Sequence, residues 1–104
     1  MMLRDLLETF RWITTYSNQE PDPEFYEPLW TYLGIKILEK LDQVPPSPES
    51  WFGWKCTVDF PNIPREELVF RPGEYSIKAY HRGRLVTDIR LGGLYEHAKK
   101  NQLL

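Results

Sequence analysis

The sequence has 104 residues, 41% of them hydrophobic and 27% charged, a composition that supplies one packed core and excludes wholesale disorder. The net charge of −2 lacks the strong basic excess of a dedicated nucleic-acid binder. A single cysteine excludes an intrachain disulfide, and no stretch is apolar enough for a membrane span. The acidic residues in the first turns are unlike a signal peptide. We therefore expect a cytoplasmic protein without a membrane partner.

Apolar residues recur at steps of three and four in the first half of the chain, which is the spacing of one helical stripe. The first stripe, in residues 3–17, predicts a helix that ends before the polar stretch 19–23. A second helix opens either with Asp22 as N-cap and Pro23 in its first turn, or afresh at Pro28, because proline suits only the first turn. Its repeating apolar positions are Phe25, Leu29, Trp30, Leu33, Ile37, Leu38 and Leu41.

The two helices are expected to pack as an antiparallel pair, and one glycine lies inside the second. Gly34 costs on the order of 1 kcal/mol relative to alanine in a helix interior. It therefore either lets another backbone come close or is tolerated without a role.

After a proline-rich joint at 45–48 the period changes from helical to alternating. In residues 52–60 every second side chain is apolar, which predicts a strand with one buried face and places Cys56 in the core. The adjacent glutamates at 66–67 are typical of the first turn of a short helix. Extended structure restarts at residues 68–70.

A hairpin is predicted next, after a type II turn at 71–74 with proline and glycine at its two central positions. Its register pairs 79 with 85 and 77 with 87, which leaves a three-residue loop at 81–83 that ends in a glycine bulge. The positions that this register buries are Tyr75, Ile77, Ala79, Leu85, Thr87 and Ile89.

These elements predict one α+β domain over residues 1–104. It combines a helical half at 1–44, an antiparallel sheet at 51–91 and a short helix at 94–101 that follows two glycines. We expect the two N-terminal helices to pack on one face of a meander of three to four strands.

No catalytic, metal or cofactor signature is recognisable in the sequence. Cys56 is expected on the apolar face of a strand, away from the exposed electropositive setting that activates a thiol. Two histidines are too few for a zinc site of histidines, and the glycines match neither a dinucleotide-binding loop nor a phosphate-binding loop. The sequence therefore predicts no catalytic residues, no metal and no cofactor.

Cations gather on the predicted hairpin 71–90, with Tyr80 among them. Cations around an aromatic ring can hold phosphates and stack a base. Glu74 and Asp88 on the same face oppose this interpretation, and cations on exposed strands also prevent edge pairing. The candidate phosphate-binding residues are Arg71, Lys78, Arg82, Arg84 and Arg90.

Aromatic residues make up 14% of the chain, so they either fill a small core with large side chains or leave some rings exposed as anchors for another protein. The candidate anchors are Trp12, Tyr16, Tyr26, Trp51 and Tyr80. We favour a non-catalytic accessory or adaptor protein that binds another protein through Trp51, Tyr80, Arg82 and Arg84. A nucleic-acid-binding module is the alternative and a small enzyme the third option, and self-association is left open.

Overall fold

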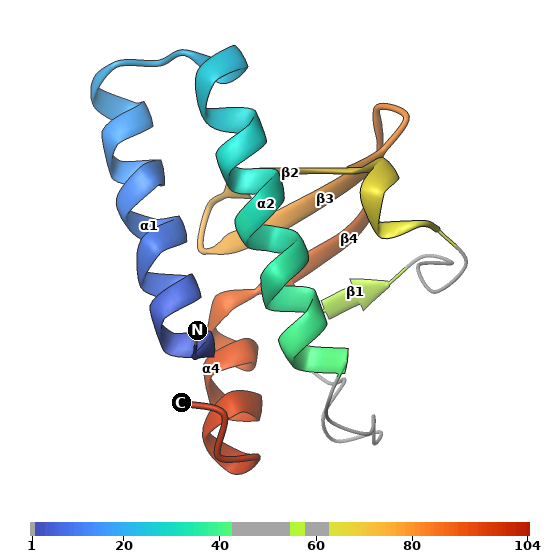
Figure 1. Ribbon diagram of the computed structural model, residues 1–104. Helices are drawn as coiled ribbons and strands as arrows, with labels where there is room; N and C mark the ends of the chain where they lie inside the picture. The colour runs from blue at the N-terminus through green and yellow to red at the C-terminus, as the bar shows by residue number, and fades with distance from the viewer. Residues whose placement is uncertain (1, 43–54, 58–62) are drawn as a thin grey trace.

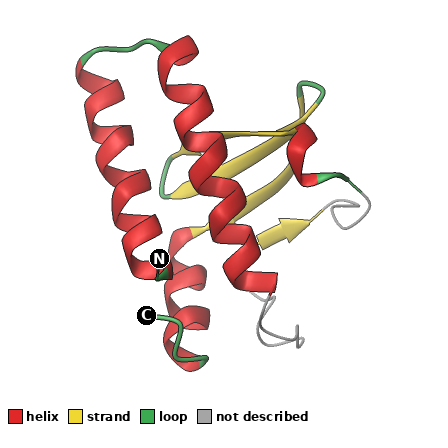
Figure 2. Cartoon of the chain, viewed as in Figure 1, coloured by secondary structure: helices red, strands yellow, loops and turns green. Residues whose placement is uncertain are grey.

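Two long helices cross one face of an antiparallel sheet (Figure 1) in the structure, a computed structural model that describes residues 2–42, 55–57 and 63–104. The elements in chain order are α1 (Leu3–Gln19), α2 (Pro23–Asp42), β1 (Lys55–Thr57), the 3-10 turn η2 (Arg65–Glu67), β2 (Leu68–Gly73), β3 (Ser76–His81), β4 (Arg84–Arg90) and α4 (Leu91–Lys100). The α+β architecture expected from the sequence is confirmed, with a short helix at the C-terminal end (Figure 2).

The α2 helix begins at one of the two positions that the sequence predicts. The α2 helix starts at Pro23, and a carboxylate oxygen of Asp22 accepts the N–H of Phe25 at 3.4 Å, which confirms the first of the two predicted starts. Pro28 consequently lies inside α2. The α1 helix extends to Gln19, two residues beyond the predicted stripe.

One buried cluster joins the helices to the inner face of the sheet. Side chains from α1, α2, β2, β3, β4 and α4 all contribute to it. The members that are 1% exposed or less are Leu3, Ile37, Leu38, Leu68, Phe70, Ile77, Ala79, Ile89, Leu94 and Ala98.

The sheet has the strand order β1-β4-β3-β2, so β2, β3 and β4 form the predicted meander and β1 pairs with β4 at the far edge. Of the predicted strand 52–60, only Lys55–Thr57 lies in the described part of the chain. Cys56 pairs with Asp88. The prediction that the Cys56 side chain faces the core lies outside the described residues.

The predicted register of the β3–β4 hairpin is wrong by two residues. Ile77 pairs with Ile89 and Ala79 with Thr87, and the loop is the two-residue turn 82–83. The shorter loop accounts for one residue of the difference and a bulge in β4 for the other, because Val86 is an extra residue between the pairs on either side of it. Strict alternation would have exposed Val86, whereas the bulge buries it.

The turn between β2 and β3 also differs from the prediction. Pro72 and Gly73 continue β2, and the chain reverses at residues 74–75 instead of at 71–74. Tyr75 takes the left-handed conformation of this turn, with φ of 58°, so the prediction that Tyr75 is buried in β3 is wrong and its side chain is 82% exposed. The carbonyl of Tyr75 accepts the N–H of Leu91 at 3.1 Å, which joins the turn to the start of α4.

The C-terminal helix begins at Leu91 instead of residue 94, directly at the end of β4. The pair Gly92 and Gly93, expected to separate the sheet from the helix, forms its first turn. On either side of this junction, Ile89 of β4 and Leu94 of α4 enter the same buried cluster.

Candidate interaction surfaces

Arg71 is held by a partner from the helical half of the chain. Its Nη2 and Nε atoms donate to one carboxylate oxygen of Glu27 on α2, at 2.6 and 3.0 Å. The same guanidinium lies 6.0 Å from the ring centre of Tyr80, at the outer limit of a cation–π contact. Tyr80 is therefore a half-buried neighbour of Arg71 and not a free anchor.

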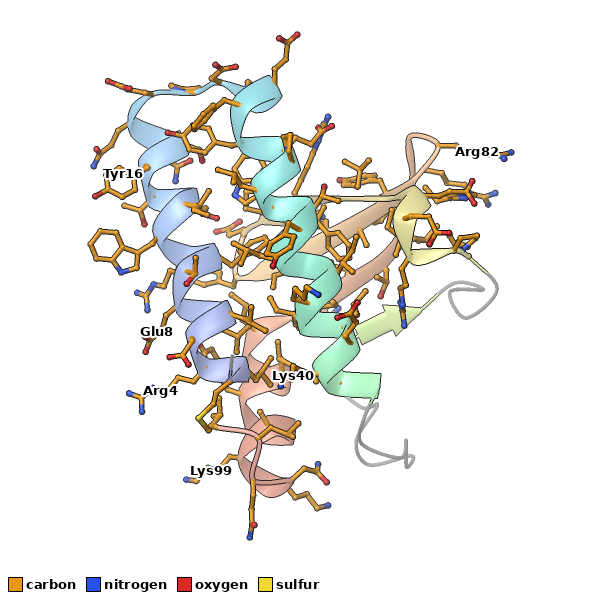
Figure 3. The ribbon with its side chains drawn as sticks, viewed as in Figure 1. Arg4, Glu8, Tyr16, Lys40, Arg82 and Lys99 are labelled. Atoms are coloured by element: carbon orange, nitrogen blue, oxygen red, sulfur yellow. The ribbon has the colours of Figure 1, made fainter. Side chains whose placement is uncertain are left out.

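Arg82 lies at the tip of the β3–β4 hairpin and extends into solvent (Figure 3). Its Nη2 atom is 3.7 Å from a carboxylate oxygen of Glu67, which is also 3.4 Å from Nε2 of His81. Glu67 belongs to η2, so one carboxylate faces two of the potential cations at this end of the hairpin. Exposed pairs of this kind contribute little to stability, and Arg82 remains accessible.

The remaining cations of the hairpin are distributed along it. Lys78 pairs with Asp88 in the register, so a carboxylate stands opposite it. Arg84 and Arg90 form no ion pair with the described residues, and they stand at the two ends of β4, roughly 20 Å apart for an extended strand. The hairpin thus brings three of its five candidate phosphate-binding residues next to carboxylates and separates the other two.

Large side chains also remain exposed on each of the two N-terminal helices. Trp12 and Tyr16 of α1 are 63% and 50% exposed, and their ring centroids are 5.6 Å apart. Tyr16 points away from α2 (Figure 3). On α2 the side chains of Phe25 and Tyr32 are each 61% exposed, with Leu29 between them. We call these five residues the aromatic helix surface.

The surface of α1 is hollowed beside its two exposed rings. A concavity of about 460 Å³ lies there, and all of its lining residues come from α1. They are Glu8, Arg11, Trp12, Thr15, Tyr16 and Gln19. An incoming side chain could therefore contact an aromatic ring and a charged group at the same position.

The sequence contained a signal for the α2 part of this surface that the helical repeat obscured. Phe25, Leu29 and Tyr32 are spaced at i, i+4 and i+7, so they form a stripe of their own on the side opposite the buried Leu38 and Leu41. Phe25 and Leu29 were assigned to the buried repeat, and the structure exposes both. Apolar stripes on two opposite sides of a helix indicate that one side faces the core and that the other is a second apolar face.

The other predicted anchors differ in their placement. Tyr26 is half-buried, with its ring centroid 5.8 Å from that of Trp30. Trp51 lies outside the described residues. Among the candidates that the structure describes, the exposed anchors are therefore Trp12 and Tyr16.

Within the described residues, no three histidine, cysteine, aspartate or glutamate side chains gather in a way that could hold a metal ion. None of the described helices is both long and apolar enough to cross a membrane. No protein-family model matches the sequence, and no curated protein or solved structure is similar to it at a significant level.

Proposed function

We propose that this chain is a non-catalytic accessory or adaptor protein that binds another protein through the aromatic helix surface. The observation that supports the proposal is the exposure of three aromatic rings at 61% or more, those of Trp12, Phe25 and Tyr32, on a domain that already has an aromatic-containing core. Single exposed apolar residues are ordinary, but several large ones on one layer of helices are typical of an interaction surface.

The chemistry of these side chains suits protein recognition. Tryptophan and tyrosine are enriched at the energetic centres of interfaces, because a large rigid ring buries much apolar area while ordering few bonds. The concavity beside Trp12 and Tyr16 offers the kind of recess in which such centres are found. Relative to the sequence-based hypothesis, the proposed surface moves from Trp51, Tyr80 and the hairpin arginines to the two helices.

Affinity capture from the native host tests the proposal by comparing the native chain with a test variant and a control variant. In the test variant Trp12→Ser and Tyr16→Ser are combined, and Leu85→Ser is the matched control, because Leu85 is an exposed apolar residue on β4 at 42% exposure. The proposal expects one stoichiometric protein to be recovered by the native chain and by the control, and lost by the test variant. Recovery of the same proteins by all three chains would contradict it.

The nucleic-acid alternative rests on Arg84 and Arg90, which form no ion pair with the described residues. Binding through them predicts affinity for a mixed-sequence oligonucleotide at low salt that falls steeply as salt rises. The combined variant Arg84→Ala and Arg90→Ala would weaken that affinity. No detectable binding at low salt would eliminate this alternative.

A further inference from the structure

A second cavity, which shares Arg11 and Thr15 with the concavity beside Trp12 and Tyr16, lies where three elements meet. It has a volume of about 360 Å³ and is lined by α1, by the turn between β2 and β3, and by the first turns of α4. Its apolar floor includes Leu7, Phe10 and Ile77, all of which are members of the core. The volume falls near the lower end of the roughly 300–1,000 Å³ that small-molecule sites occupy.

The charge in this groove has one sign. Arg11 is the only arginine, lysine or histidine among the lining residues, and no carboxylate lines the groove. Arg11 makes no ion pair with any described residue, whereas Arg4 on the same helix is paired with Glu8 at 3.2 Å. An apolar floor beside one unpaired guanidinium is complementary to a ligand that has an apolar body and one negative charge.

The rim of the groove carries a residue that the backbone does not favour. Tyr75 has φ of 58°, a conformation that costs a residue other than glycine about 1 kcal/mol or more, and its side chain is 82% exposed. The ring therefore contributes almost no buried area to offset the strained backbone. Left-handed backbone at a bulky residue is concentrated at ligand sites, and Tyr75 lines this groove together with Tyr95.

We infer that the groove between α1, the β2–β3 turn and α4 binds a small carboxylic acid with an apolar body, its carboxylate on Arg11 and its body on the floor between Tyr75 and Tyr95. The inference does not depend on the aromatic helix surface or on a protein partner. It assigns a function to the one lining residue with a permanent charge and to the strained tyrosine, neither of which the core requires.

The probe is 3-phenylpropionate, and its neutral counterpart 3-phenylpropionamide has nearly the same shape. Titration of the isotopically labelled protein, followed by amide chemical shifts, is expected to move signals from Leu7, Ile77 and Leu91 with the acid. The amide is expected to bind at least tenfold more weakly, because it lacks the charge that pairs with Arg11. Equal affinity for the acid and the amide would overturn the assignment of the carboxylate to Arg11.

Three variants separate ligand binding from folding. Arg11→Gln is expected to abolish the preference for the acid, while Arg4→Gln, an exposed arginine outside the groove, should retain it. Tyr75→Asn should weaken acid binding several-fold although it relieves the strained backbone and raises Tm. Shifts absent from the groove at millimolar probe, or a preference for the acid that persists in Arg11→Gln, would refute the inference.

Discussion

Gly34 of α2 lies directly against the aromatic ring of Phe70 on β2. A Cβ atom built at position 34 would overlap three ring carbons of Phe70, whose side chain is fully buried. The glycine thus admits a side chain from the sheet, and not another backbone, to the surface of the helix. This contact sets how closely α2 approaches the edge strand β2.

Gly34→Ala is expected to destabilise the protein, although alanine favours a helix interior by about 1 kcal/mol over glycine. The added methyl group must displace a ring in a packed core, and overpacking costs about 1–3 kcal/mol, so we expect a net loss near 1 kcal/mol. Urea denaturation measures it. In a Phe70→Leu background the same change should cost less, because a smaller side chain leaves room for the methyl group. A gain in stability from Gly34→Ala in the native background would contradict this packing.

A side chain of α2 forms a hydrogen bond with the backbone of the edge strand β2. The hydroxyl of Thr31 accepts the backbone N–H of Phe70 at 3.0 Å, and β2 is the edge strand of the sheet. Thr31→Val keeps the shape and removes the acceptor, so we expect a loss of about 1–3 kcal/mol and faster hydrogen exchange at the Phe70 amide. Thr9→Val is the control, since the Thr9 hydroxyl bonds only to the Asp5 carbonyl on exposed helix. Equal losses in both variants would show that the edge bond has no special effect.

The hairpin tip carries a residue that its backbone does not favour. Arg82 has φ of 52° and Gly83 has φ of 78°, as in the two-residue turns that prefer the pair asparagine and glycine. Arg82→Asn is therefore expected to raise the free energy of unfolding by about 0.5–1 kcal/mol, because the ion pair that it removes is largely exposed. Thermal unfolding checks the gain. Arg84→Asn is the matched change outside the turn, and a similar gain there would refute the explanation from turn geometry.

The pair of Glu27 and Arg71 joins the helices to the sheet at the surface. Arg71 is 56% and Glu27 31% exposed, so we expect a coupling energy below about 1 kcal/mol in spite of the short 2.6 Å contact. A double-mutant cycle with Glu27→Gln and Arg71→Gln measures it at low and high salt. A coupling well above this value, unchanged by salt, would mean that the pair is effectively buried.

The order of the elements could be predicted from the sequence because the spacing of apolar residues within each element indicates its type. Leu6 and Phe10 repeat at helical spacing, and Asp22 followed by Pro23 marks a helix start. The register of β3 and β4 could not be read in this way. Alternation assigns Leu85 to the buried face and Val86 to the exposed one, but a bulge reverses both, and the cost of a bulge depends on how the core packs around it.

The candidate sites were less predictable than the fold, for a related reason. Composition reveals an excess of aromatic rings but not which rings the core leaves exposed, and Phe25 matches the buried repeat of α2 as well as its solvent stripe. The partner of Arg71 was likewise hidden, since Glu27 lies 44 positions away in the chain. Contacts that join distant segments depend on packing, which the local periods do not encode.

The central claim, that the aromatic helix surface binds a protein, is tested most directly by the affinity of the captured partner for Trp12→Ala. Because Trp12 is 63% exposed, the variant should unfold at the same urea concentration as the native protein. A tryptophan at the centre of an interface contributes about 2 kcal/mol or more, so we predict that Kd rises about thirtyfold. An unchanged Kd for Trp12→Ala, Phe25→Ala and Tyr32→Ala, each with native stability, would contradict the claim.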